Sequence, residues 1–325
     1  MPLLTPKVRL EDVVLDACFD DPELLAVRGA VADTGRPVQE RADRAIRLVL
    51  ARRPDPERQL LAQEVLADAG HHLAPELARR ATAPDLDPDD RADTLGLAAA
   101  AHVAAAWQVR GAGAADTVGA DPAKASHTLL EIADDLALDG LRAVPDSPGC
   151  ALARVVAGRG RGVPDDELLH RFEVARRRDP LAFAAHLQTL QAVCQKWFGS
   201  HDSMFDLVRQ TLAVAPAGHP VTVVLPVAHL EYLAAGETDA MQRRRHDLPH
   251  VHTLSAALLA ADDGHPRAME AHSGFGWFFA SVGEKATARA HLRRSWLRPS
   301  WIWTYLDDDA RRTYVEVLKE NGAAR

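Results

Sequence analysis

The densest group of potentially reactive side chains is a histidine cluster in the segment HDLPHVH, which contributes His246, His250 and His252. Neutral imidazoles bind Zn²⁺ and Ni²⁺, so these three residues are candidate metal ligands. Pro249 is expected to interrupt a helix here, which removes the i,i+4 geometry of a helical metal pair. No Glu or Cys stands beside them at a ligand spacing. We therefore expect a solvated loop, and the sequence predicts no cofactor.

The segment GRGRG at 158–162 combines glycine N–H groups with two positive charges, as a phosphate-binding nest does. It lacks the GK[ST] ending of a P-loop. It also follows a predicted helix, whereas the nucleotide-binding glycine motifs follow a strand. We interpret it as a turn between two helices, ahead of Pro164.

Arginine also forms two triplets, at 176–178 and 243–245. Both lie near the C-termini of predicted helices, where the helix dipole stabilises cations. Solvated helix ends explain them most simply, and an anion-binding face is the alternative. In the second triplet, Arg243 and Arg244 are the candidate binding residues.

The sequence contains no GxSxG or HExxH motif and no Ser, His and Asp in a triad order. Asp307–Asp309 resembles a metal-binding carboxylate run, but it precedes a predicted helix, where carboxylates cap free N–H groups. Cys194 has His186 and His201 nearby in the sequence, yet spacing within a helix pair does not create a nucleophile and base. We expect a protein without catalytic activity, and an enzyme stays the alternative.

Aromatic residues are concentrated near the C-terminus of a chain that has only 5% of them overall. Part of this group must pack in the core. Trp301, Trp303 and Tyr305 alternate along the chain, so they cannot all lie on one narrow helical face. Core packing is the favoured interpretation, and a binding surface that includes Trp277, Trp301 and Trp303 is the alternative.

Prolines and glycines divide the chain into predicted helices with connections of a few residues, a pattern typical of stacked antiparallel helix pairs. The apolar run Leu95–Val109 is too short and too rich in Ala to span a bilayer, and we expect a buried core helix. Val144–Gly149 is the expected seam between an N-terminal helical region of irregular pairs, 1–145, and a C-terminal region, 146–325. The predicted helices are 22–33, 38–51, 57–69, 91–109, 123–139 and 308–320.

The segment HSGFGWFFASVGEKATARAHLRRSWLRP, residues 272–299, can be aligned with the tetratricopeptide pattern. Gly276 and Ala288 take the positions where small residues let two helices cross closely, and Gly283 is expected to end the first helix. The segment resembles a tetratricopeptide repeat, with looser matches that close at Pro180 and Pro216 and an irregular stretch after them. The segment KWFGSHDSMFDLVRQ, residues 196–210, followed by this C-terminal repeat, is also similar to helical proteins that are common in actinobacteria.

This resemblance implies an all-α fold, a right-handed superhelical array of antiparallel helix pairs that ends in a capping helix. It also implies a concave face that binds a peptide or a partner protein. The alternative is an enzyme or a small-molecule-binding protein with a pocket between helices near 246–305. Neither interpretation transfers a catalytic residue to this sequence.

The net charge of −8 argues against a general binder of nucleic acid or of anionic membranes. Three cysteines lie far apart without a CxxC motif, which is typical of a reducing compartment. The N-terminal segment has no apolar core of a signal peptide. We therefore expect a cytoplasmic protein with a protein partner, and homo-oligomerisation is left open.

Overall fold

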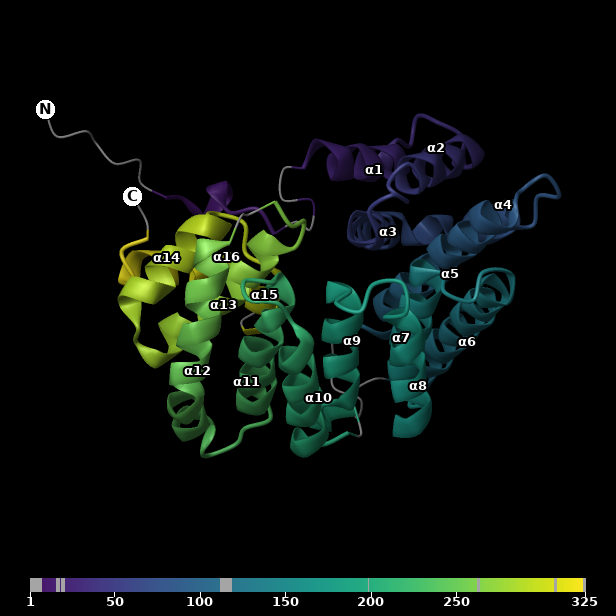
Figure 1. Ribbon diagram of the computed structural model, residues 1–325. Coiled ribbons are helices and arrows are strands. Elements are labelled where there is room, and N and C mark those ends of the chain that lie inside the picture. Colours follow the sequence, from purple (N-terminus) through teal and green to yellow (C-terminus); the bar gives the residue numbers. More distant parts are fainter. Residues whose placement is uncertain are drawn as a thin grey trace, which may run out of the picture. The chain divides into compact units, whose positions relative to one another are not determined.

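The computed structural model describes residues 8–15, 18, 21–111, 119–197, 199–261, 264–306 and 309–323. These residues form α-helices and short 3₁₀ helices joined by turns, and no β-strand occurs among them (Figure 1). The all-α class is therefore confirmed. In the same part of the chain, no helix combines the length and the apolar character needed to cross a membrane.

Contacts between Cα atoms divide the chain into two compact units. Unit 1 comprises residues 1–19, 194–196 and 200–325, and unit 2 comprises residues 20–193 and 197–199. The expected seam at Val144–Gly149 lies inside unit 2, because the helices on either side of it pack against each other.

Three helices of unit 2 begin at an Asp-Pro pair in the sequence. Asp21, Asp55 and Asp87 are N-caps whose carboxylates accept hydrogen bonds from backbone N–H groups, and a proline follows each of them. The cap of the long alanine-rich helix is Asp87, and the helix begins at Pro88, three residues before the predicted start at residue 91. The helices are α1 (Pro22–Ala32), α2 (Val38–Leu50), α3 (Pro56–Gly70), α4 (Ala74–Ala81), α5 (Pro88–Arg110), α6 (Ala120–Ala143), α7 (Pro148–Arg161), α8 (Asp165–Ala175) and α9 (Phe183–Val193).

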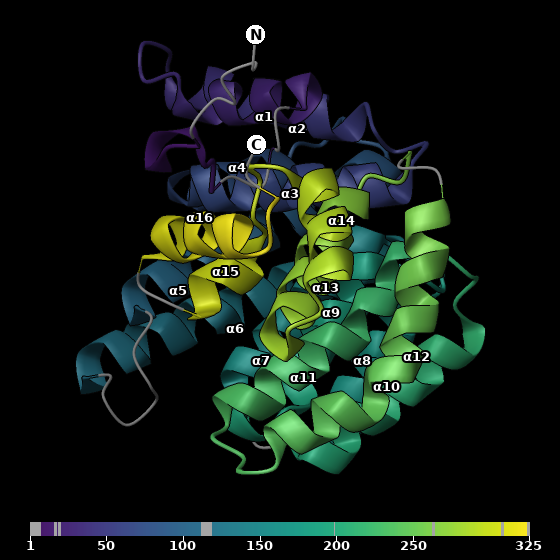
Figure 2. The same cartoon turned by 90° about the vertical axis from the view of Figure 1, so that its left-hand side faces the viewer.

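Helices α5, α6 and α7 cross at close range because small residues lie at their contacts, and α5 and α6 run side by side (Figure 2). A Cβ atom on Gly140 of α6 would lie 2.3 Å from Cys150 Sγ of α7. A Cβ atom on Gly96 of α5 would lie 3.1 Å from the backbone nitrogen of Cys150. The Cys150 thiol donates a hydrogen bond to the carbonyl of Ala92 at 3.1 Å. Glycine is therefore the residue that fits at both crossings.

Unit 1 begins with a short N-terminal segment that contains the 3₁₀ helix Leu10–Asp12. The other described residues of unit 1 are mostly helical. Its α-helices are α10 (His201–Val214), α11 (Val224–Ala234), α12 (Ala240–Ala260), α13 (Ala268–Val282), α14 (Lys285–Ser295), α15 (Trp301–Leu306) and α16 (Ala310–Glu320).

The helix pair expected within 272–299 is present as α13 and α14. Gly283 ends α13 in the left-handed conformation, with φ of 84°. A Cβ atom on Gly276 would lie 2.9 Å from Leu292 Cδ2, and Ala288 is fully buried between the two helices. The small residues thus allow the close crossing that the sequence predicted.

The expected loop at 247–252 is wrong, because α12 continues through Pro249. Proline removes one hydrogen bond and frees the carbonyl four residues earlier, that of Arg245. Arg245 lies on an exposed part of the helix, where water can satisfy that carbonyl. Val251 and Leu258 on the following turns are buried, and their packing stabilises the helix beyond the proline.

Candidate functional site

A cavity of about 270 Å³ lies in unit 2 among helices α3, α5, α7 and α9. Six alanine, valine and leucine side chains of α5 and α7 form the apolar part of its wall, and the lining residues Asp68 and Gln108 are exposed to solvent. Its polar lining consists of Gln63, Glu64, Asp68, Gln108, Arg159 and Gln188.

The cavity exists because α5 carries alanine where a larger residue would fill the space. Ala100 and Ala104 lie one turn apart on the cavity side of α5 and are only partly buried. The opposite side, which includes Leu95, Ala99 and Ala106, is buried. The prediction of a buried core helix is therefore confirmed for most of Leu95–Val109, but the sequence did not predict that one side of this helix faces a cavity.

Two indoles and two guanidinium groups gather at the Trp107 end of the cavity. Trp107 and Trp197 meet edge to face with ring centroids 5.6 Å apart. The Arg159 Cζ atom lies 5.4 and 5.5 Å from these two centroids, and that of Arg110 lies 5.7 and 5.5 Å from them. Arg159 Nη1 also donates a hydrogen bond to Gln188 Oε1 at 2.8 Å. A cation held over an aromatic ring is attracted by the negative face of the ring, which stabilises each guanidinium.

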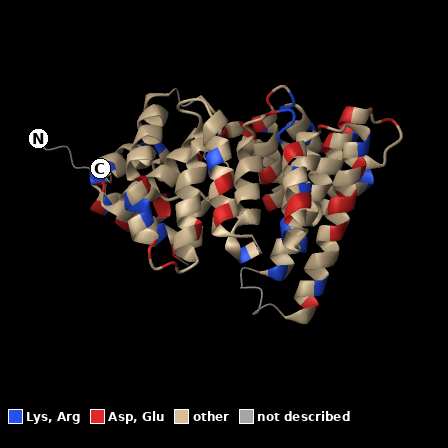
Figure 3. Ribbon diagram, turned by 60° about the horizontal axis from the view of Figure 1, so that its bottom comes forward, with Lys and Arg blue, Asp and Glu red and all other residues tan. Residues whose placement is uncertain are grey.

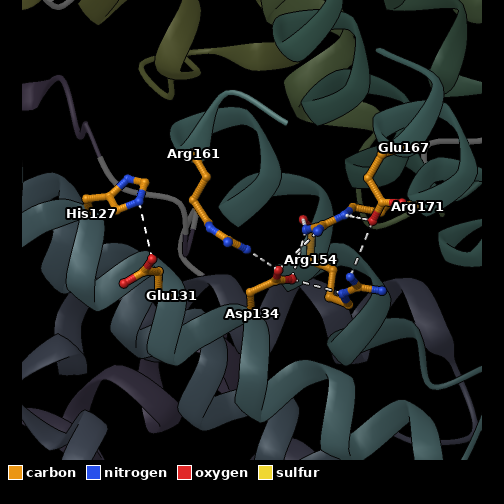
Figure 4. A network of polar contacts seen from close by, with 7 residues as sticks. All are labelled: His127, Glu131, Asp134, Arg154, Arg161, Glu167 and Arg171. Atoms are coloured by element: carbon orange, nitrogen blue, oxygen red, sulfur yellow. Dashed lines mark hydrogen bonds and ion pairs between the residues drawn. The ribbon is translucent and has the colours of Figure 1, made fainter. Parts of the chain in front are cut away.

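The opposite side of α7 is held by a buried ion-pair network around Asp134 of α6 (Figure 4). The Asp134 carboxylate accepts hydrogen bonds from Arg154 Nε at 2.9 Å, from Arg171 Nη1 at 2.8 Å and from Arg161. Arg171 also donates to Glu167 at 2.8 Å. Burial by itself raises the pKa of Asp134, but the hydrogen bond from Arg154 and the charge of Arg171 outweigh it and lower that pKa.

The glycine–arginine segment, residues 158–162, ends α7 and directs its two arginines to different sides of that helix. Its residues form the last turn of α7, and Gly162 ends the helix in the left-handed conformation with φ of 65°. Arg159 turns toward the cavity and Arg161 toward Asp134. A Cβ atom on Gly160 would lie 2.6 Å from Leu130 and 3.2 Å from the Trp107 ring, so this glycine admits the indole. The prediction of a turn at residues 158–162 is therefore wrong for residues 158–161, which are helical.

The histidines proposed as metal ligands lie on the continuous helix α12. The side chain of His246 is 84% exposed, and His250 is exposed as well. His252 lies 3.9 Å from Glu284 and packs on the Phe279 ring at 4.8 Å. Across the described ranges, no group of three or more His, Cys, Asp or Glu side chains is placed to hold a metal ion.

Arg243 and Arg244 point to different surroundings. The Arg243 Cζ atom lies 3.8 Å from the centroid of the Phe205 ring and 5.0 Å from that of Tyr232. Arg244 is 4% exposed and donates a hydrogen bond to Ser281 Oγ at 2.8 Å. Burial lowers the pKa of Arg244. The two arginines do not share one face.

The three tryptophans proposed as a binding surface also lie in different surroundings. Trp277 and Trp303 are buried, with 5% and 1% of their surface exposed, which favours the packing interpretation. Trp303 Nε1 donates to Ser273 Oγ at 2.9 Å. Trp301 is half-buried and donates to Glu270 at 3.0 Å, next to the partly exposed ring of Tyr305.

Cys194, which the sequence places near His186 and His201, lies against a buried carboxylate. Its Sγ atom lies 3.9 Å from Glu231 Oε2, a carboxylate whose side chain is 3% exposed. Lys196 Nζ donates to the same oxygen at 2.8 Å, and the Tyr305 hydroxyl donates to it at 3.1 Å. Burial and then the charge of Glu231 raise the pKa of Tyr305.

Two buried histidines between α13 and α14 form a further polar cluster. His272 Nδ1 and His291 Nδ1 are 2.8 Å apart, and Ser255 Oγ lies 2.7 Å from His291 Nε2. The Phe275 ring stacks on His291 at 5.2 Å. Burial, followed by the charge of His272, lowers the pKa of His291 well below its ordinary value. The sequence offered no signal for this pair, because its members are 19 residues apart on different helices.

Acidic and basic residues do not separate into patches in this view. Figure 3 shows them interspersed along the helices, in keeping with 46 acidic and 38 basic residues in the chain.

Comparison with known proteins gives no match to a family model, to a curated protein or to a solved structure.

Asp134→Asn is expected to destabilise unit 2 strongly, because three guanidinium groups would lose the buried charge that compensates them. Removing one partner of a buried ion pair costs about 3–5 kcal/mol. Urea unfolding followed by circular dichroism measures the loss. Asp139→Asn on the same helix is the matched control, since its carboxylate is 58% exposed, and it should change stability by less than about 0.5 kcal/mol. Equal losses for both variants would contradict this account.

The buried histidine pair predicts that unit 1 loses stability in mild acid. The folded-state pKa of His291 lies below its ordinary 6.5, so its contribution is complete above pH 6.5 and falls as the pH drops below that value. One such group accounts for at most about 1.4 kcal/mol per pH unit.

Urea unfolding at pH 7.5 and pH 5.5 tests this expectation. His291→Gln should reduce the pH dependence, whereas His246→Gln, which alters an exposed side chain, should preserve it. Part of the dependence remains in both variants, because burial also lowers the pKa values of His102 and His229. An unchanged slope in His291→Gln would rule out the pair as its source.

Proposed function

We propose that the protein binds a small molecule in the cavity of unit 2. One observation carries this proposal: an apolar hollow lined by Ala100, Ala104 and Val156 ends at a half-buried guanidinium, Arg159, stacked among two indoles. Ligand sites are mostly apolar concavities with a few placed polar groups that fix the orientation of the ligand. Stability alone would favour filling such a space, because cavities between packed helices cost free energy.

The size of the cavity supports a small ligand. A volume of about 270 Å³ corresponds to about nine water molecules at liquid density. This is just below the range of about 300–1,000 Å³ that is usual for drug-sized ligands. We therefore expect a ligand of about ten non-hydrogen atoms that leaves one end at the exposed rim.

Binding fits the lining better than covalent catalysis does. The described residues that line the cavity offer Gln, Glu, Asp, Arg and Trp as their polar groups, and no Ser, Cys, Lys or His. A covalent mechanism that uses a hydroxyl, thiol or amine nucleophile would need one of these four side chains beside a base. The proposed site also differs from the pocket near 246–305 that the sequence suggested, since it lies between helices of unit 2.

Filling the cavity tests the proposal. Ala104→Leu places a larger side chain in the hollow and should abolish the binding of small molecules without loss of thermal stability. Ligand-observed NMR with a panel of aromatic and aliphatic compounds of about ten non-hydrogen atoms provides the measurement. Ala105→Leu is the matched control, because Ala105 is the next residue of α5 and does not line the cavity. Binding that survives in Ala104→Leu, or no binding by any compound, would refute the proposed site.

A second candidate is the partner-binding role implied by the resemblance to tetratricopeptide repeats. We propose that the C-terminal helices form part of a right-handed array of antiparallel pairs and present a surface to a protein in the cytoplasm. The partly exposed ring of Tyr305, 39% exposed beside Trp301, supports this candidate. Trp296 is another exposed aromatic residue of the same segment, at 36%.

Site-specific photo-crosslinking in cells tests this second candidate. A Tyr305→p-benzoylphenylalanine variant should give one dominant adduct with a partner protein, whereas the same group at the exposed Arg142 should not. Identical adduct patterns at the two positions would indicate random collisions. No adduct at position 305 would remove the support that the exposed aromatic residues lend to a partner surface.

A further inference from the structure

The amide of Gln63 in the wall of the cavity indicates which polar group a ligand brings to it. We propose that the ligand is an apolar molecule whose N–H or O–H group donates a hydrogen bond to the side-chain oxygen of Gln63. This inference rests on the proposed function and names the chemical class of the ligand. Alcohols, phenols and N–H heteroaromatic compounds belong to this class, whereas ethers, esters and carboxylates, which only accept hydrogen bonds, do not.

The side-chain amide of Gln63 is held in one orientation. Its Nε2 atom donates a hydrogen bond to the carbonyl oxygen of Gly149 at 3.1 Å. A carbonyl oxygen can only accept, so this bond identifies the nitrogen and the oxygen of the amide. The Oε1 atom lies beside the bare Cα of Gly149, where a Cβ atom would be 2.3 Å from it. Glycine at the start of α7 therefore leaves room for this oxygen.

Gln63 Oε1 is an acceptor to which no described residue donates a hydrogen bond. Gln63 is 4% exposed and lines the cavity, so the small part of its surface that is not packed faces the hollow. A hydrogen bond to an oxygen in such apolar surroundings is stronger than one in water, and an unmatched buried acceptor is costly. A ligand that supplies an N–H or O–H group to this oxygen therefore gains affinity over one that does not.

The side of α3 that lines the cavity presents acceptors and no further donor. It consists of residues 63, 64, 67 and 68, which share one side of the helix. Besides Gln63 these are Glu64, Ala67 and Asp68, and an ionised carboxylate only accepts hydrogen bonds. The donor on this side, Gln63 Nε2, is bonded to Gly149. A ligand group that donates matches this side of the cavity, and one that only accepts does not.

The amide of Gln188 is the competing anchor for a ligand. Its Oε1 atom accepts a hydrogen bond from Arg159 Nη1 at 2.8 Å, which leaves its Nε2 atom as a donor. Gln188 is half-buried, so water can accept from this donor when no ligand does. The gain from pairing with a ligand is therefore larger at the more deeply buried Gln63. A preference for ligands that only accept is the reverse result to be tested.

The walls beside Gln63 require an apolar body on the ligand. Leu152 and Ala153 line the cavity on the turn of α7 that follows Gly149, and Ala100 and Ala104 line it on α5. None of these four side chains forms hydrogen bonds, and burial of apolar surface against them is favourable. The ligand class thus combines one donor with an apolar body.

Indole and benzofuran discriminate the two preferences, because they share one bicyclic shape and differ in having an N–H donor or an ether oxygen. Isothermal titration calorimetry with the full-length protein should show indole binding at least about tenfold more tightly. A purely apolar hollow would favour benzofuran, the less polar compound. Gln63→Met removes the acceptor at similar length and should reduce the preference for indole to less than about threefold. Gln108→Met is the matched control, because Gln108 lines the cavity but is exposed to solvent, and it should keep the preference.

Each outcome separates the ligand class from the cavity itself. Equal binding of the two compounds, or tighter binding of benzofuran, would overturn the donor ligand while leaving the cavity as a ligand site. If neither compound binds although others of the NMR panel do, the ligand class is wrong and the proposed function stands. A full preference for indole in Gln63→Met would show that another group recognises the donor. Indole binding that persists in Ala104→Leu would show that the cavity is not the site. The comparison on the unaltered protein decides the ligand class even if Gln63→Met fails to fold.

Discussion

A carboxylate buried among three guanidinium groups is the interaction on which the arrangement of unit 2 depends. Asp134 is 7% exposed and binds arginines from α7 and α8, so one acidic residue of α6 holds three helices together. A buried charge without a partner is costly, and every alternative rotation of α7 would leave Asp134 or Arg171 without its partners. The rotation of α7 about its own axis is thereby restricted, and this restriction places Arg159 on the opposite side of the helix.

The position of Arg159 gives the cavity its chemical character. Without a cation the hollow beside Ala100 and Ala104 would be a packing defect between α5 and α7, and the proposed binding of a small molecule depends on the guanidinium of Arg159 in its wall. Gly160 contributes to the same end, because the absence of its side chain lets Trp107 approach α7. Unit 1 buries its polar groups in a different way. Its core places His272, His291 and Ser255 in a hydrogen-bonded chain, in which the pKa of His291 is lowered.

Much of the secondary structure could be predicted, and the exceptions have physical causes. The helix starts at Asp-Pro pairs and the helix end at Gly283 depend on neighbouring residues alone, and the predicted helices there are confirmed. The loop around Pro249 was predicted from the same local rule and was wrong, because burial of Val251 and Leu258 outweighs one lost hydrogen bond. The candidate site was missed because its residues are spread over α3, α5, α7 and α9.

By itself the sequence determined the helical class, the boundaries of α1, α2 and α3 to within one residue, and the close crossing at Gly276, since these depend on local conformation and side-chain size. Only the tertiary structure decided which way each reactive side chain points. Arg159 and Arg161 are two residues apart, yet one faces the cavity and the other Asp134. Successive positions of a helix differ by about 100° in direction, so the neighbours of each residue are set by the helices packed around it.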